Sequence, residues 1–320
     1  MTSMTFKRSR LALIAVALGV IVLSSLSLAG ITSAQGLGYQ YDSGARQVTL
    51  VTPALNVRVS TGGNVPHFMF WDPNFVDPNT RLTYHVQFYQ LIEFNDTNGD
   101  GTYTNGTDQV VAPILGLGRV SWDFSGFLTE ETDGETTAVH FNFTLDSVQG
   151  PDIQYDELYM ELRCHINTTN ANELKFDIVI SGWPWAHNDT YLALRWDLMV
   201  QSPGTLTYRH AYQHRYENHT FAFDGAFFAY QRSANVGNDT VDVTSNYESA
   251  PEKTMFYLVY PNFGDDVLVH DPLIGLDGSV IPPDSLLLTL IVVGAGALAC
   301  VVIGAAIWTR RRTTQPTPST

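Results

Sequence analysis

The chain contains little cysteine and little positive charge, and each shortage excludes a class of protein. Its 320 residues include only two cysteines, Cys164 and Cys300. A small exported domain stapled by disulfides needs more, so the fold must depend on a buried apolar core. There are 17 Lys and Arg against 32 Asp and Glu, giving a formal net charge of −15 at pH 7. Because phosphate contacts need clustered Lys and Arg, this composition argues against a nucleic-acid partner.

Familiar catalytic motifs are also missing. The sequence has no G-x-S-x-G, no H-E-x-x-H, no P-loop and no G-x-G-x-x-G. The hydrolase, zinc-protease and nucleotide-binding sites that depend on those spacings are therefore not indicated. A pair of carboxylates for glycoside hydrolysis stays open, because its members are set by distance in space rather than by spacing.

Two long uncharged segments lie near the ends of the chain. Three basic residues, Lys7, Arg8 and Arg10, precede the first, Leu11–Ile31, and small residues follow it. This order predicts a secretory signal peptide over residues 1–34, with an uncleaved anchor as the alternative.

The second uncharged segment runs from Leu286 to Trp308, and Arg310, Arg311 and Arg312 follow it. As a helix it would be about 34 Å long, enough to cross a bilayer. Basic residues beside such a helix stay cytoplasmic, so we expect a single span with residues 309–320 inside the cell. Gly296, Cys300 and Gly304 recur every four residues, and this spacing of small residues makes a helix dimer as plausible as ordinary composition.

Residues 37–271 are then expected to form an extracellular domain, joined to the membrane by a short linker over 272–285. Apolar and polar residues alternate over Val139–Leu145, Leu158–Ile166, Leu174–Ile180 and Leu192–Val200. Period-two alternation indicates antiparallel strands with one buried face. No amphipathic helix is evident, so the sequence predicts an all-β antiparallel sandwich, either one large or two small.

Asn-x-Thr sequons are numerous in the same region. They predict N-glycosylation of an exported domain, with accidental matches in a Thr-rich β sequence as the alternative. The seven asparagines are Asn95, Asn105, Asn142, Asn167, Asn188, Asn218 and Asn238.

Residues 96–101, DTNGDG, place oxygen-bearing side chains at alternate positions before a glycine. That spacing is similar to the first half of the calcium-binding loop of EF-hands and dockerins, and Ca²⁺ needs six to eight hard oxygen ligands. Position twelve is Thr107 rather than Glu, and no flanking helices are evident. The predicted structural Ca²⁺ ligands are Asp96, Asn98, Asp100, the Thr102 carbonyl and Asp108. The alternative is a hairpin loop that uses ordinary Asn-Gly and Asp-Gly turns.

Trp183 and Trp185 flank a proline between two strong strand patterns. Paired aromatic rings in a loop can stack on a sugar or fill a partner's pocket. The alternative is that one or both rings cap the core.

Two apolar ends, Thr-type sequons, an acidic β domain and a terminal Arg cluster together resemble the architecture of archaeal cell-surface glycoproteins. Where some of those proteins carry a Pro-Gly-Phe processing motif, this chain has residues 282–285, PPDS. The resemblance implies a membrane-anchored surface glycoprotein for adhesion, binding of a glycan or surface-protein ligand, or envelope structure. Two alternatives stay open: a membrane-tethered hydrolase of polysaccharide, and a haem-binding redox module with axial His or Met ligands.

Overall fold

The computed structural model describes residues 37–60, 66–75, 77, 79, 81–149, 154–205, 207–210 and 214–277. The predicted signal peptide, the membrane helix, the tail and the Gly296, Cys300 and Gly304 face lie outside these residues. Within them, no helix has the length and apolar character that crossing a bilayer requires. The one helix described is a 3-10 turn, η1 (Leu117–Arg119).

Two antiparallel sheets make up the described part of the chain, which confirms the all-β prediction. In spatial order, sheet A contains β1 (Gly38–Asp42), β2 (Gln47–Val51), β3 (Asn56–Ser60), β4 (His67–Trp71), β5 (Thr83–Asn95), β12 (Tyr191–Gln201), β20 (Lys253–Pro261) and β19 (Thr244–Ala250). Short strands extend it: β6 (Gln109–Val110) and β7 (Leu115–Gly116) pair with β5, and β13 (Tyr208–Arg209) pairs with β12.

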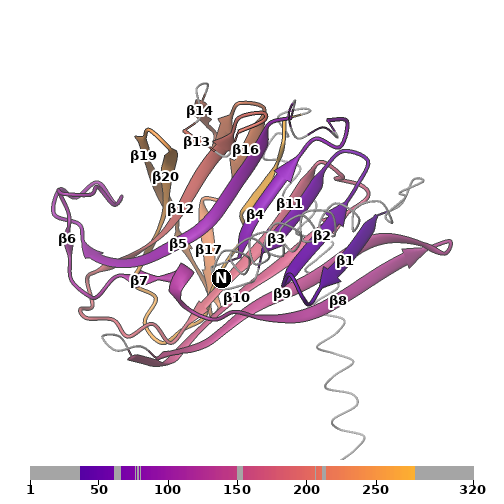
Figure 1. The fold of residues 1–320 in the computed structure, drawn as a ribbon. Helices are drawn as coiled ribbons and strands as arrows, with labels where there is room; N and C mark the ends of the chain where they lie inside the picture. The colour runs from indigo at the N-terminus through magenta and orange to yellow at the C-terminus, as the bar shows by residue number, and fades with distance from the viewer. Residues whose placement is uncertain are drawn as a thin grey trace, which may run out of the picture. The chain divides into compact units, whose positions relative to one another are not determined.

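Sheet B contains, in spatial order, β14 (His214–Glu217), β15 (Thr220–Phe223), β16 (Ala226–Ala229), β22 (Leu273–Leu276), β11 (Glu173–Ser181), β10 (Gln154–Asn167), β9 (Glu135–Gln149) and β8 (Asp123–Thr132). A short branch extends from β11: β21 (Leu268–His270) pairs with β11, β17 (Ser233–Val236) pairs with β21, and β18 (Asp239–Asp242) pairs with β17. Figure 1 shows β1 to β4 in order across one sheet, with the long strands β8, β9 and β10 in the other.

The sheets pack face to face around one continuous core, so the chain forms one large sandwich rather than two small ones. The Trp196 ring of sheet A lies 3.9 Å from Phe88 on the neighbouring strand and 5.5 Å from Phe176 of sheet B, measured between ring centroids. At one edge the sheets meet through Tyr41 of β1 and Phe124 of β8, whose rings stack at 4.4 Å. Burying these aromatic rings supplies much of the driving force for folding.

The sandwich continues beyond the expected start of the linker at residue 272. Strand β22 pairs with β11 and β16, and both Leu273 and Ile274 are buried. Strand β22 thus lies between β11 and β16, and the chain remains part of sheet B as far as Leu276.

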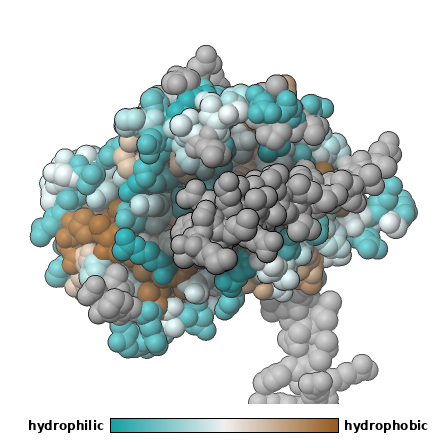
Figure 2. All heavy atoms as spheres, viewed as in Figure 1, coloured by the Kyte–Doolittle hydropathy of each residue, from teal (hydrophilic) through white to brown (hydrophobic). Residues whose placement is uncertain are grey.

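The outer face of sheet A is partly covered by the loop of residues 96–108. Its Tyr103 is buried against Phe94 and Tyr257, with ring centroids 5.0 and 5.1 Å away, in a small second apolar cluster. Figure 2 shows a mostly hydrophilic face with an apolar patch beside β6 and β7, where Val110 and Ile114 are exposed.

Candidate functional site

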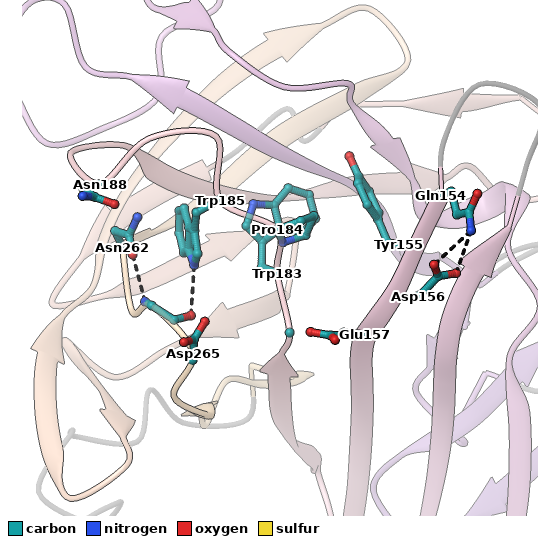
Figure 3. Close-up of a pocket in the computed structure, with 12 residues that line it drawn as sticks. Gln154, Tyr155, Asp156, Glu157, Trp183, Pro184, Trp185, Asn188, Asn262 and Asp265 are labelled. Atoms are coloured by element: carbon teal, nitrogen blue, oxygen red, sulfur yellow. Dashed lines mark hydrogen bonds between the residues drawn. The ribbon is translucent and has the colours of Figure 1, made fainter.

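A pocket of about 600 Å³ opens at one end of the sandwich, where three segments meet. They are the start of β10, the loop after β11, and the loop after β20 (Figure 3). The described lining residues are Gln154, Tyr155, Asp156, Glu157, Gly182, Trp183, Pro184, Trp185, Asn188, Asn262, Gly264 and Asp265. Both sequence-predicted tryptophans are among them.

A glycine allows the loop after β11 to cross over β10. Gly182 has φ +66°, and a Cβ at this position would lie 1.9 Å from the Glu157 carbonyl oxygen. Neither the left-handed backbone nor this close approach suits an L side chain. Gly182 therefore sets the path that brings Trp183 and Trp185 to the pocket.

Trp183 is a wall of the pocket and also a cap on the core. It is only 3% exposed, and its ring lies 5.3 Å from that of Tyr155. Its Nε1 donates a hydrogen bond of 3.0 Å to Oε2 of Glu93. For this residue, the interpretation as a core cap is the one that the structure favours.

Glu93 is fully buried and ties the loop to the end of β5. Besides Trp183, it accepts hydrogen bonds from the Ala186 backbone N–H at 2.9 Å and the Thr190 hydroxyl at 2.7 Å. A buried carboxylate is tolerated when donors surround it, and here three donors do so. Glu93 was not predicted from the sequence. Its position, two residues after the inward-facing Leu91, would have indicated a buried acid that needs hydrogen-bond donors.

Trp185 is only half-buried, and it joins the two loops of the pocket. Its ring meets Phe263 edge-on at 5.1 Å, and its Nε1 donates to the Gly264 carbonyl at 3.2 Å. Asn262 strengthens the junction, since its Oδ1 accepts from Gly264 N and its Nδ2 donates to the His187 carbonyl. In Figure 3, the Trp185 ring stands beside Asn262 and Asp265 in the pocket wall.

Charge in the pocket is negative. Asp156, Glu157 and Asp265 are exposed there, and the described lining includes no Lys or Arg. Nε2 of Gln154 donates to both carboxylate oxygens of Asp156, at 3.0 and 2.9 Å. Carboxylates and amides beside aromatic rings can accept and donate hydrogen bonds to a hydroxyl-rich ligand.

The predicted calcium ligands lie in one loop, but each carboxylate accepts hydrogen bonds from other residues of that loop. Asp96 accepts from the backbone N–H groups of residues 99 and 101, at 2.8 and 2.7 Å. Asp100 accepts from the Thr102 N–H and hydroxyl and from Asn98 Nδ2. Asp108 accepts from residues 97 and 104. The described residues hold no group of three or more His, Cys, Asp or Glu side chains arranged for a metal. The calcium site stays a prediction.

The seven sequon asparagines fall into two groups. Five are exposed: Asn95, Asn105, Asn188, Asn218 and Asn238. The two on the outer face of sheet B are half-buried; Asn142 Nδ2 donates to Glu161 Oε1 at 2.6 Å, and Asn167 Oδ1 accepts from Asn170 N at 2.8 Å. Asn188 lines the pocket, so a glycan there would compete with any ligand. Glycosylation itself stays a prediction.

Comparisons with known proteins give only distant structural likeness. No family model matches the chain, and no curated protein does. Among solved structures, heparan sulfate lyase HepC from Pedobacter heparinus is 10% identical, with a TM-score of 0.33 over 78% of this chain and 36% of that one. A HepC mutant gives the same TM-score at 9% identity. A heparinase III, the BT4657 gene product, gives 0.28 over 75% of this chain and 34% of that one. The chain thus spans about a third of these enzymes, and a likeness this weak carries no functional argument.

Proposed function

We propose that the sandwich is a carbohydrate-binding domain of a surface-displayed protein, and that the acidic aromatic pocket receives a neutral sugar. The pocket of Trp185 and its neighbours carries the proposal. Of its three aromatic side chains, the two that are only partly buried, Tyr155 and Trp185, offer apolar ring surface, and its exposed carboxylates offer hydrogen-bond acceptors. A sugar ring combines an apolar face with a rim of hydroxyls, so both kinds of group have a partner.

The charge of the pocket narrows the ligand class. Asp156, Glu157 and Asp265 would repel a carboxylate or a sulfate, because the described lining has no cation to offset them. Hydroxyl donors have no such penalty. Neutral hexose oligosaccharides are therefore the expected ligands.

The test is a titration of the full-length chain in mild detergent with a panel of neutral oligosaccharides, followed by calorimetry. For a sugar that binds, Trp185→Ala should weaken the affinity about tenfold, which corresponds to about 1.4 kcal/mol. Asp265→Asn, at an exposed position, should weaken it less and leave the unfolding midpoint unchanged. Phe75→Ala removes an exposed ring outside the pocket and is the matched control.

Equal affinity of wild type and both pocket variants would contradict the proposal. Mass spectrometry of the incubated sugars serves as a second measurement. Shortened products would favour the polysaccharide hydrolase instead, with two of the pocket carboxylates as acid and base.

A further inference from the structure

A pair of arginines on the outer face of sheet A lies against one tryptophan. The guanidinium carbon of Arg81 is 4.2 Å from the Trp71 ring centroid, and that of Arg58 is 5.4 Å away. Trp71 itself is 3% exposed. Cation–π attraction holds such groups against a ring, but it does not neutralise their charge.

No anion offsets these two charges within the part of the chain that the structure describes. Neither Arg58 nor Arg81 has an ion pair there, and the Nε of each is buried without an acceptor. Burial lowers the pKa of both guanidinium groups, and for Arg81 the positive charge of Arg58 lowers it further. Bringing two like charges together without a counter-charge is unfavourable in folding.

The nearest acids along the chain are engaged elsewhere. Asp72 accepts from the backbone N–H and side-chain amide of Asn74, and Asp77 accepts in the same way from Asn79. Both carboxylates thus cap their own turns.

A polar acceptor beside the pair is unsatisfied as well. Asn56 is opposite Trp71 in the ladder between β3 and β4, and its Oδ1 is buried without a donor. All three polar side chains are only partly buried, so a ligand can still reach part of each. A ligand that carries an oxyanion next to a hydroxyl would supply both missing partners.

We propose that Arg58, Arg81 and Trp71 form a binding site for an oxyanion of the carboxylate or sulfate class, received as a substituent of an acidic sugar or as a free ion. This site is on the outer face of sheet A and is separate from the neutral-sugar pocket. Arginine suits it, because its planar guanidinium can give two parallel hydrogen bonds to either anion.

The experiment uses the full-length chain in mild detergent at constant ionic strength. Sodium glucuronate, sodium sulfate and neutral methyl glucoside are each titrated, and binding is followed by calorimetry. Glucuronate or sulfate should bind and methyl glucoside should not bind at this site. Arg58→Gln/Arg81→Gln should weaken anion binding at least tenfold, whereas Arg119→Gln, which removes one charge at an exposed position, should not change it.

A second measurement needs no variant and so does not depend on folding of the double mutant. Phenylglyoxal modifies accessible arginines, and peptide mass mapping locates them. Glucuronate or sulfate should protect Arg58 and Arg81 but leave Arg119 reactive. Protection by sulfate alone would support a free-anion site, and protection by glucuronate would support the acidic sugar. No protection by either anion, or unchanged affinity in the double variant, would overturn the proposal.

Discussion

The outer face of sheet A carries two clusters of similar composition. Each has two cationic side chains packed against one aromatic ring. In the closed cluster, Arg195 and Lys253 lie 4.3 and 4.7 Å from the Tyr89 ring centroid, and Asp197 pairs with both. In the open cluster, Arg58 and Arg81 lie against Trp71.

The difference between the clusters is one carboxylate. Asp197 Oδ1 accepts from Arg195 Nε at 2.8 Å, and only 2% of the Asp197 side chain is exposed. No described carboxylate takes that place beside Trp71. Among the described residues, Arg58 and Arg81 thus have no carboxylate partner although the chain is strongly acidic overall, and the proposed external anion would supply the missing charge.

The largest expected effect comes from opening the closed cluster. Asp197→Ala should lower the free energy of unfolding by about 3–5 kcal/mol, because Arg195 and Lys253 would remain partly buried without their counter-charge. Urea unfolding of the full-length chain measures the change. If the comparison is right, added sulfate should restore part of the lost stability in this variant.

Two controls accompany that measurement. Asp239→Ala removes an exposed carboxylate and should change stability by less than about 0.5 kcal/mol. Asp197→Asn keeps the shape of the side chain and removes its charge, so its loss of stability should lie between those of Asp197→Ala and Asp239→Ala. A cost below 1 kcal/mol for Asp197→Ala would show that the internal anion contributes little.

Much of the fold could be predicted from the alternation of apolar and polar residues alone. The strands β9 to β12 have a buried face and a wet face, so apolar residues recur at every second position. Strand β8 escaped prediction because most of its residues are exposed and its register shifts between Phe124 and Phe127. Cys164 belongs to the alternating segment Leu158–Ile166 and is fully buried, and burial raises the pKa of its thiol.

The sites were less accessible to sequence reasoning. Trp183 and Trp185 could be identified because they lie two positions apart in one loop, but the partner loop at Asn262 is about 80 residues further along the chain. The site at Trp71 could not be predicted from the sequence. Arg58 and Arg81 come from different segments and contact Trp71 only after the sheet has formed. Period-two patterns report which face a residue occupies, not which distant residue lies beside it.

A smaller effect concerns two histidines on neighbouring strands of sheet A, His67 of β4 and His85 of β5. Met69 pairs with Arg58 on one side and His85 on the other, and His85 Nδ1 lies 3.0 Å from His67 Nε2. Burial lowers the pKa of both histidines to about 4, and for His85 the neighbouring His67 contributes. Both are therefore neutral at pH 7 and add no charge beside the arginines.

The pH dependence follows from these values. Between pH 6.5 and 4 the unfolded chain binds protons that the folded histidines do not, so stability falls as the pH is lowered through this window. His67→Gln should reduce that fall by at most about 2.5 kcal/mol at pH 4.5. Urea unfolding from pH 7.5 to 4.5 checks it, with the exposed His187→Gln as control. Parallel curves for wild type and His67→Gln would exclude a neutral buried His67.

The smallest expected effect is also the most direct comparison of the two clusters. Lys253→Met removes one cation from the closed cluster and should cost about 1 kcal/mol, because the contact with Tyr89 and one partner of Asp197 are lost. Arg81→Met removes one cation from the open cluster, where no carboxylate is left unpaired and the repulsion with Arg58 disappears. In anion-free buffer it should therefore be neutral or slightly stabilising by urea unfolding. If Arg81→Met costs as much as Lys253→Met, Arg81 stabilises the fold without any ligand, and the two clusters differ in composition but not in role.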